Sequence, residues 1–587
     1  MIETPVLIVG GGPVGLTASI YLSHFGIDSL LVDKHPGTAI LPKARALNAR
    51  TMEMYRQIGL EDAIREVAMP ARFGGAVIWT ESLAGREIKR LETGRASAGN
   101  RGFSVTTNCG CSQDILEPVL RARAESSERA TVRFGWEMTE LQCEADGVLA
   151  RLRTGDGRVE SVHARFVIAA DGSQSGIRTR LGIARNGQTD VYDSVNIHLR
   201  ADLTPWIAQR PAALYLVEQP DLRGTFLTID GARRWGFLVT SLSHYGYAPQ
   251  QFTPEFCTRI VRRAVGVEQL DVEVLGVSAW KASALVAECY RSGPVLLAGD
   301  AAHEMPPTGG FGMNTGVQDV QNLAWKLAAV LRGRAGDTLL DTYDAERRPV
   351  GTAVTHASLL NALSMGRTAR QSQAVLPRRE FLNEIGLIFG ARYQSSAIVA
   401  EAGPAVADEH EDEIQTYVPS AAPGCRAPHA WVRIGGRRMS TLDRIGRGFV
   451  LFTAPDGRAW RDAAAAISDP LLSDVVVVEG DAEEENAADL DSPAGRGGSR
   501  GPRGEGSPRA WLAAYGIDAD GAVLVRPDGH VGWRSQGGVP DAVGVLHDVF
   551  DGILCRGAGG SSFPSFGTGV ASSDASVPAA HGGSRPS

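Results

Sequence analysis

The chain of 587 residues is long enough for about two to four domains. Hydrophobic residues make up 43% of it and charged residues 21%, so a sizeable core is available. Its 59 basic and 67 acidic residues leave a net charge of −8, which argues against a nucleic-acid binder, because such proteins usually carry a basic stripe. No apolar run reaches the ~18 residues of a membrane span, so we expect neither a nucleic acid nor a membrane as partner.

The cysteine and histidine patterns argue against small disulfide-linked or metal-linked scaffolds. The seven cysteines are odd in number and none belongs to a C-x-x-C pair, which disfavours a disulfide framework and a zinc ribbon. The twelve histidines show no metal-type spacing, so no metal site is predicted. The simplest setting for such a chain is the reducing cytoplasm.

The first 33 residues predict a strand, a helix and a second strand. Residues 6–9 form a short apolar run, as in a strand buried on both faces of a parallel sheet. No basic segment precedes this run and glycines follow it, so we expect a strand rather than a signal peptide. Residues 13–25 carry apolar side chains at helical spacing, and a second apolar run, 29–32, ends at Asp33. This order is a βαβ unit that opens an α/β fold.

Further along, pieces of the same fold alternate with β-rich stretches, which indicates a second domain built from insertions. Helical spacing recurs at 50–67, 113–128 and 315–332, and more loosely over 340–400. Apolar runs and alternation predict strands within 131–170 (a meander closing on the buried run 166–170), 213–218, 224–229, 235–240 and 294–298.

A glycine motif follows the first predicted strand. Gly10, Gly12 and Gly15 fit G-x-G-x-x-G, in which the glycines allow a tight turn, close approach of a pyrophosphate and close packing of helix on strand. Asp33 ends the second strand 18 residues after Gly15, where a carboxylate accepts both ribose hydroxyls of an adenosine. The motif predicts a dinucleotide site but does not decide between NAD and FAD, and a glycine-rich turn without a ligand is the alternative.

Two further strands end in an aspartate next to a glycine. Asp171-Gly172 follows the run 166–170, and taken alone it is a common surface turn. Gly299-Asp300 follows 294–298 and places a carboxylate at the carboxyl edge of the sheet, the usual ligand crevice. The loop 306–310 then leads into a helix whose N-terminal amides stabilise an anion.

These three motifs, in this order and spacing, resemble the single-component FAD-dependent aromatic hydroxylases, the group of p-hydroxybenzoate hydroxylase and phenol hydroxylase. Within that group the chain is most similar to the subgroup that acts on phenols and polycyclic aromatic polyketides. The resemblance covers residues 4–360 and, more weakly, 421–556. It implies an α/β fold with a Rossmann-type FAD-binding domain, an inserted β-rich substrate domain and a C-terminal thioredoxin-like domain.

The resemblance also implies domain boundaries. The expected divisions are 1–75, 105–188 and 281–360 for the FAD-binding domain, 76–104 and 189–280 for the substrate domain, 361–420 for a helical connection and 421–556 for the thioredoxin-like domain. Composition predicts disorder in the insert 481–508 and the tail 557–587, which hold few large apolar residues. Cys425 and Cys555 stand alone, so the last domain lacks a redox dithiol and we expect a structural role or a homodimer.

Cofactor contacts carry over by resemblance onto matching positions. Gly10, Gly12 and Gly15, with Pro13, would cradle the FAD pyrophosphate, and Asp33 would bind its adenosine ribose. The other residues implied to contact the cofactor are Lys43 and Arg45 near the pyrophosphate and flavin, Gln113 at the flavin, Asp171 at FAD and the visiting NAD(P)H, Asp300 at the ribityl chain, and Pro307, Gly310, Gly312, Met313 and Asn314 around the isoalloxazine.

Two positions depart from the family pattern. Lys43 stands where arginine is usual, which keeps the charge but loses the bidentate fork. Arg45 aligns with a catalytic acidic residue of phenol hydroxylase-type members, and a cation cannot serve as that base. Arg45 is therefore a candidate catalytic residue that stabilises an ionised substrate, or else a structural salt bridge, and the proton goes to another residue or to solvent.

The implied function is an NADPH- or NADH-consuming monooxygenase that hydroxylates a phenolic or polycyclic aromatic substrate with O₂, through a flavin C4a-hydroperoxide. Baeyer–Villiger oxygen insertion on the same scaffold is one alternative, and a non-catalytic flavin-binding protein is another. No separate nicotinamide-binding domain is visible. Four aromatic residues of the β-rich stretch line a substrate pocket or form ordinary core: Trp206, Tyr215, Phe226 and Trp235.

Overall fold

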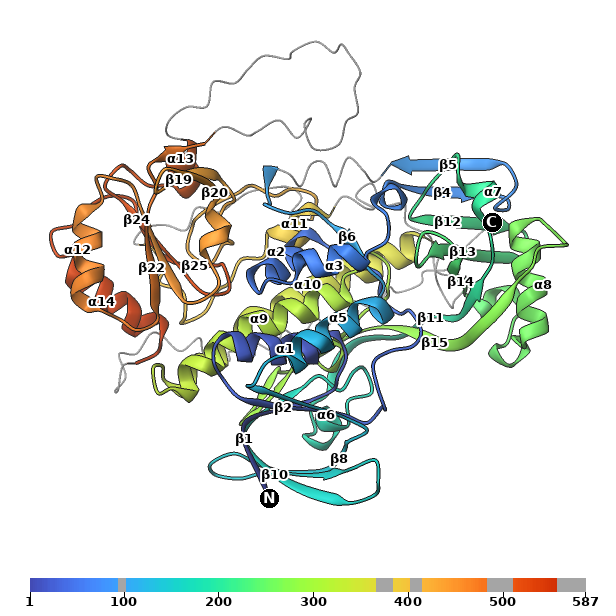
Figure 1. Cartoon of the computed structure of the whole chain (residues 1–587), viewed down its shortest axis with the longest axis horizontal. Helices are drawn as coiled ribbons and strands as arrows, with labels where there is room; N and C mark the ends of the chain where they lie inside the picture. Colours follow the sequence, from blue (N-terminus) through green and yellow to red (C-terminus); the bar gives the residue numbers. More distant parts are fainter. Residues whose placement is uncertain (93–101, 366–383, 402–413, 483–509, 557–587) are drawn as a thin grey trace, which may run out of the picture.

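The first sheet lies around β1 (Ile2–Val9), the strand predicted from the run 6–9. Its strands follow the order β16 (Arg291–Ser292), β17 (Val295–Leu297), β10 (Val159–Ala169), β1, β2 (Ser29–Asp33) and β7 (Ala130–Phe134), with β8 (Glu137–Cys143) and β9 (Val148–Arg153) added to β10. β1 pairs in parallel with β10 and β2. Val6, Leu7 and Ile8 are fully buried because the strand is covered on both faces. α1 (Pro13–His24), α5 (Gln113–Glu125) and α9 (Gly312–Leu331) pack together beside this sheet (Figure 1).

This computed structural model describes residues 1–92, 102–365, 384–401, 414–482 and 510–556. The predicted disordered tail 557–587 and residues 483–508 of the predicted insert lie outside the described residues. Two described helices, α9 and α10 (Asp341–Ser364), have the length to cross a membrane, but neither is apolar enough to do so.

A second sheet forms the part drawn at the right of Figure 1. Its order is β18 (His303–Glu304), β15 (Glu273–Ala287), β11 (Arg185–Arg200), β14 (Arg234–Thr240), β13 (Leu222–Thr228), β12 (Leu214–Gln219), β4 (Ala76–Thr80) and β5 (Glu87–Glu92). Alternate residues of β11, among them Val195 and Ile197, join a core with α8 (Pro254–Val265). We call this the outer face of the second sheet. The residues between them, such as Asn196 and His198, belong to the opposite, inner face.

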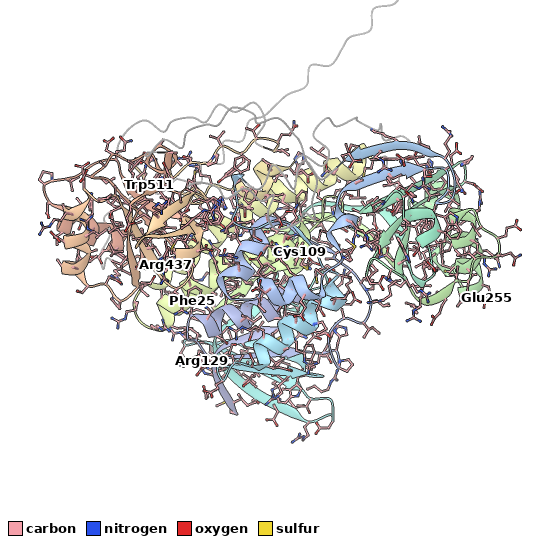
Figure 2. All side chains as sticks on the ribbon, turned by 45° about the horizontal axis from the view of Figure 1, so that its top comes forward. Phe25, Cys109, Arg129, Glu255, Arg437 and Trp511 are labelled. Carbon is pink, nitrogen blue, oxygen red and sulfur yellow. The ribbon has the colours of Figure 1, made fainter. Side chains whose placement is uncertain are left out.

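The C-terminal module, drawn at the left in orange and red, has its own sheets (Figure 1). A four-stranded sheet has the order β22 (Leu472–Val477), β21 (Phe449–Thr453), β24 (Ala522–Val525) and β25 (Val531–Ser535), and a smaller one joins β20 (Arg437–Ser440), β19 (Trp431–Ile434) and β23 (Gly480–Asp481). β21 and β22 are parallel and the other pairs antiparallel, and α12 (Arg458–Ile467) packs on α14 (Ala542–Ile553). Trp511 of α13 (Ala510–Tyr515) and Arg437 mark this module in Figure 2, opposite Glu255 of α8.

Shorter elements connect these parts. They are β3 (Ala46–Leu47), β6 (Cys109–Gly110), α6 (Gly176–Arg180), α7 (Thr204–Ile207), α11 (Ile385–Phe389) and the 3₁₀ turns η1 (Ala71–Gly74), η3 (Leu242–Tyr245), η4 (Pro249–Gln251), η5 (Gly299–Ala301), η6 (Asp337–Leu340) and η7 (Thr441–Arg444).

The predicted secondary structure is wrong in three places. The helical spacing expected over 340–400 gives α10 and the short α11, but residues 390–401 form no helix. The helix expected over 50–67 is two helices, α2 (Ala49–Gln57) and α3 (Glu61–Val67), because Gly59 between them has a φ of +71°. The meander expected over 131–170 contains only β8 to β10, since β7 pairs in parallel with β2 instead.

A cluster of buried charges joins the C-terminal module to the helices of the first domain. Arg526, just after β24, donates from Nη1 and Nη2 to the two carboxylate oxygens of Glu346 on α10, at 2.7 and 2.8 Å. Lys326 on α9 donates to Glu346 at 2.7 Å, and Arg526 also pairs with Asp528. These side chains are at most 1% exposed, so their attraction is little screened by solvent.

Replacing Arg526 by methionine is expected to destabilise the protein by about 3–5 kcal/mol, because it leaves buried carboxylates short of a partner. The matched control is Arg444→Met, which breaks the exposed pair with Asp474 and costs at most about 1 kcal/mol. Urea unfolding measures both. Equal losses in the two variants would contradict the role given to the buried cluster.

Candidate active site

The glycine motif brings two loops of the first sheet into contact. Gly10 has a φ of +115°, and a Cβ there would lie 2.1 Å from the carbonyl oxygen of Ala170. A Cβ on Gly15 would lie 1.8 Å from the carbonyl oxygen of Gly10. At Gly12 the nearest atom would be Oε1 of Glu117, 4.0 Å away. A side chain at Gly10 or Gly15 would thus clash with the protein backbone. Gly12, the residue before Pro13 at the start of α1, leaves open space instead.

Asp33 holds the glycine loop in place. Its Oδ2 accepts a hydrogen bond from the backbone N–H of Gly11 at 2.6 Å, and its Oδ1 accepts one from the backbone N–H of His35 at 2.7 Å. The carboxylate at the end of β2 therefore lies against the glycine loop, and its predicted contact with an adenosine ribose stays a prediction.

The two Asp-Gly and Gly-Asp motifs meet at the carboxyl edge of the first sheet. Arg178, on α6, donates to the carbonyl oxygens of Ser173 at 3.0 Å and Ala301 at 2.9 Å, and so ties one motif to the other. Asp171 accepts from the backbone N–H of Ile177 at 3.2 Å through Oδ2, while its buried Oδ1 has no hydrogen-bond partner.

Asp300 lies beside Gly312, at the start of α9. Its side chain is exposed, yet surrounding protein raises the pKa of its carboxyl, and the charge of Lys43 acts in the opposite direction. A Cβ on Gly312 would lie 3.9 Å from Oδ1 of Asp300. No hydrogen bond to the Asp300 carboxylate occurs within the described ranges, so both oxygens remain available as acceptors.

Asn314 joins the loop before α9 to the loop before α2. Its Nδ2 donates to the carbonyl oxygens of Ala46 at 2.9 Å and Gly310 at 2.7 Å, and its Oδ1 accepts from the backbone N–H of Asn48 at 3.0 Å. The amide is thus engaged with the protein itself. Of the other residues predicted here, Met313 is buried and Pro307 exposed.

Gln113 and Glu117 lie one turn apart on α5. Nε2 of Gln113 donates to Oε1 of Glu117 at 2.6 Å, and the backbone N–H of Ala39 donates to its Oε2 at 2.6 Å. Burial raises the pKa of the Glu117 carboxyl. Sequence reasoning missed Glu117 as a site residue, although its spacing of four from Gln113 on a predicted helix was the available signal.

Arg45 connects the loop before β3 to the second sheet. Its Nη1 donates to the carbonyl oxygen of Thr228 at 3.0 Å and its Nη2 to that of Ala213 at 2.8 Å. The predicted salt bridge is therefore wrong, because both of these acceptors are backbone carbonyls. Burial lowers the pKa of Arg45 to about 10, so the guanidinium remains charged at neutral pH.

The four aromatic residues proposed for a pocket belong to the core instead. Tyr215, Phe226 and Trp235 are buried on the outer face of the second sheet, and Trp206 packs against the same cluster. The ordinary-core alternative is the correct one.

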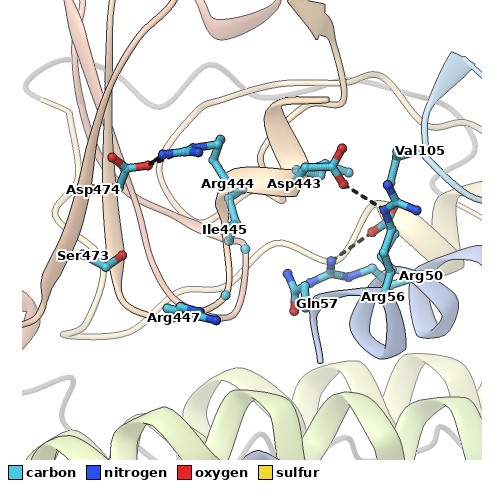
Figure 3. A pocket seen from close by; sticks show the side chains of 14 residues that line it. Arg50, Arg56, Gln57, Val105, Asp443, Arg444, Ile445, Arg447, Ser473 and Asp474 are labelled. Carbon is cyan, nitrogen blue, oxygen red and sulfur yellow. Dashed lines mark hydrogen bonds and ion pairs between the residues drawn. The ribbon is translucent and has the colours of Figure 1, made fainter. Parts of the chain in front are cut away.

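A cavity of about 360 Å³ lies between α2 and the C-terminal module, and none of the predicted cofactor residues lines it. Figure 3 shows Arg56 of α2 facing Asp443, to which it donates at 2.8 Å, and Arg444 beside Asp474. A third arginine of the lining, Arg50, pairs with Glu53. Since these three arginines already have carboxylate partners, we interpret the cavity as an ionic seam between domains.

One group of residues with metal-ligand chemistry comes together on the surface, although no metal was predicted. Ligand atoms of Glu144, Asp146 and His163 lie within 4.8 Å of one another. Both carboxylates are exposed and no second observation points to an ion, so we assign no metal to them.

Two protein families match the chain: the FAD binding domain, over residues 3–358, and the C-terminal domain of aromatic-ring hydroxylases, over residues 420–554. The chain belongs to the FAD-dependent aromatic-ring hydroxylases. It is thus a flavoprotein monooxygenase with the α/β FAD-binding fold that the motifs predicted.

Individual hydroxylases of the family cover nearly the whole chain. A tetracenomycin A2 monooxygenase-dioxygenase of Streptomyces glaucescens is 36% identical over an alignment of 585 residues, and the match covers 95% of this chain and 98% of the relative. A 4-methyl-5-nitrocatechol 5-monooxygenase of Burkholderia sp is 36% identical over 571 residues, 94% and 98% of the two chains. The crystal structure of aklavinone-11 hydroxylase with FAD and aklavinone matches with a TM-score of 0.82 at 31% identity, over 95% of this chain and 100% of that chain.

The glycines of this hydroxylase predict two different defects. Gly10→Ala is expected to lower stability by about 1–3 kcal/mol or more, because the φ of +115° is strained for alanine and the Cβ meets Ala170. Gly12→Ala has room for its methyl group, so the flavin-free protein should melt as the wild type does, while the flavin content of the purified protein falls. Thermal unfolding and flavin absorbance per chain measure these effects, and full flavin content in Gly12→Ala would contradict the prediction.

Proposed function

We propose that this enzyme uses NADPH or NADH and O₂ to hydroxylate a phenolic or polycyclic aromatic ring of the polyketide type. The named relatives act on such rings: tetracenomycin A2, 4-methyl-5-nitrocatechol and, in a solved complex, aklavinone. The observation that carries the proposal is that the three FAD-type motifs meet at one edge of the first sheet, where Arg178 ties the second motif to the third. Arg45 connects this edge to the second sheet.

The residues at the carboxyl edge of the first sheet fit FAD. Gly12 leaves backbone accessible at the start of α1, where a pyrophosphate gains from the helix N-terminus. Asp171 has a buried oxygen without a partner and Asp300 has two available oxygens, which suits hydroxyl groups of the ribityl chain. Gly10, Gly15 and Asp33 are assigned to the cofactor by the family resemblance, because the chain itself already contacts the two glycines and both oxygens of Asp33. Asn314 and Gln113 act by holding the loops around the cofactor.

When bound, the flavin supplies the oxygen-transfer chemistry, for which we propose the C4a-hydroperoxide route. The chain positions the ring and excludes water. Arg45 spans from the flavin loops to the second sheet, so its charge favours an ionised phenol between them. Lys43 adds a second cation close to Asp300.

Three further expectations remain proposals. The C-terminal module has a mixed sheet, which supports a thioredoxin-like domain, and homodimerisation is its proposed role. No disulfide joins any of the seven cysteines, all of which the structure describes, and this supports a cytoplasmic setting. The domain boundaries are proposed as stated above, and the separation of the two large sheets from the C-terminal module supports a three-part division, although β11 and β15 run a few residues past the boundaries at 188 and 280.

The test is a flavin spectrum of the purified enzyme, followed by NADPH and NADH oxidation with phenol, 4-nitrocatechol and the hydroxyanthraquinone alizarin. We expect at least one ring to stimulate oxidation and to gain one oxygen atom from labelled O₂ as a hydroxyl group. Asp300→Ala should lower flavin content sharply. Product connectivity identifies Baeyer–Villiger insertion, and unstimulated oxidation with all three compounds would contradict the function.

Arg45 should set the pH dependence of hydroxylation. An opposite charge within ~4–6 Å lowers a phenol pKa by about one unit or more, so Arg45→Ala should shift the pH profile upward by about one unit and increase NAD(P)H oxidation without product. Arg45→Lys keeps the charge but not the fork that reaches both carbonyls, and should retain part of the coupling. The exposed Arg233→Ala serves as control. Wild-type coupling and pH profile in both Arg45 variants would show that the residue is only structural.

A further inference from the structure

The inner face of the second sheet carries one histidine between two glycines. His198 on β11 is paired with Gly236 on β14 and with Gly276 on β15, so these three residues form a row across the sheet. Directly paired residues point to the same face. His198 therefore belongs to the face opposite the core with α8, and no side chain flanks it within the row.

Three elements of the first domain approach this face around His198. A Cβ on Gly276 would lie 3.0 Å from Leu41, in the loop before Arg45. Asp114, in the first turn of α5, pairs with Arg234, two residues before Gly236 on β14. Leu359 of α10 joins the cluster around Tyr192 farther along β11. The face near His198 is thus bordered by the segments that carry Arg45 and Gln113, both assigned to the flavin side of the site.

The His198 side chain is buried, and one of its ring nitrogens makes no hydrogen bond in the described part of the chain. It is 5% exposed, and its buried Nδ1 has no hydrogen-bond partner in the described part of the chain. The charges that face it are Asp114 on α5 and Arg234 on β14, which neutralise each other, while β15 contributes only Gly276 and Ser278 beside it. Arg200, farther along β11, is turned to solvent and pairs with Glu273.

We propose that His198 is the proton acceptor that activates the phenolic substrate on the inner face of the second sheet. This rests on the proposed function and supplies the base that Arg45 cannot be. The O–H bond of the phenol breaks, an N–H bond forms on the imidazole, and the electron pair stays on the oxygen, which makes the ring richer in electrons. After oxygen transfer the ring carbon loses its proton to solvent, and the second oxygen atom of O₂ takes up protons and leaves as water. The imidazolium returns its proton to the product oxygen.

The protonation state of His198 suits this role. Burial lowers its pKa below the usual value, although Asp114 partly opposes that shift. The imidazole is consequently neutral at pH 7 and able to accept a proton. Because the protonated ring cannot do so, turnover should fall as the pH drops through this lowered pKa, below about 6.5.

The test uses the FAD-loaded enzyme and 4-nitrocatechol, whose ionised form is coloured. At a pH where free 4-nitrocatechol is protonated but His198 is still neutral, the wild type should bind it with a larger share of the spectrum of the ionised form than His198→Asn does. Hydroxylation of the best ring of the panel should fall about 10²–10⁴-fold in His198→Asn and recover as the pH approaches the phenol's own pKa. His244→Asn, an exposed histidine of the same sheet region, is the matched control.

His198→Gln is the second variant, whose longer side chain fills more of the space left by the imidazole. Flavin content and melting temperature show whether both variants are folded. A wild-type share of the ionised spectrum or wild-type turnover in both folded variants would overturn the inference and leave the proposed function intact. If no ring binds to the wild type or stimulates it, the proposed function fails and the inference fails with it.

Discussion

Two neighbouring side chains on α10 connect the cofactor motifs to the C-terminal module. Glu346 faces Arg526 of that module, and Arg347 donates to Asp319 of α9 at 2.9 Å. Asp319 in turn accepts from the backbone N–H of Gly299 at 3.1 Å and from His303 at 2.7 Å, and so fixes the turn that presents Asp300. Because these charges are fully buried, each requires its partner, and the arrangement exists only when all three parts of the chain are assembled.

A second set of contacts also connects the C-terminal module to the turn at Gly299. Arg347 also donates to the hydroxyl of Tyr393 at 3.1 Å, and the Tyr393 ring stacks on His530 with 3.9 Å between centroids. A contact made by His530 of the C-terminal module therefore reaches the Gly299 turn through three side chains, those of Tyr393, Arg347 and Asp319. The module thus helps to hold the turn that carries Asp300, even though it has no redox dithiol of its own.

The sequence predicted those features that depend on local pattern. The glycine motif, Asp33 and the turns at Asp171 and Asp300 were found because each follows a buried apolar run within a few residues. The partners of Arg45 could not be predicted, because they are backbone carbonyls, which every residue type carries. Glu346 and Arg526 are 180 residues apart, and alternation along β11 does not tell which face carries His198 toward the first domain.

The second sheet has a consequence for how such enzymes diversify. Most of it comes from one continuous stretch of chain, so recombination between relatives can exchange this sheet, with the face proposed for the substrate, and leave the glycine motif untouched. Several contacts cross that boundary, however, among them Arg45 to the carbonyls of Ala213 and Thr228, Asp114 to Arg234, and Leu41 to the backbone at Gly276. A sheet from a relative must therefore fit the Arg45 loop and the first turn of α5, which come from the recipient chain. This restricts which second sheets a given FAD-binding domain can accept.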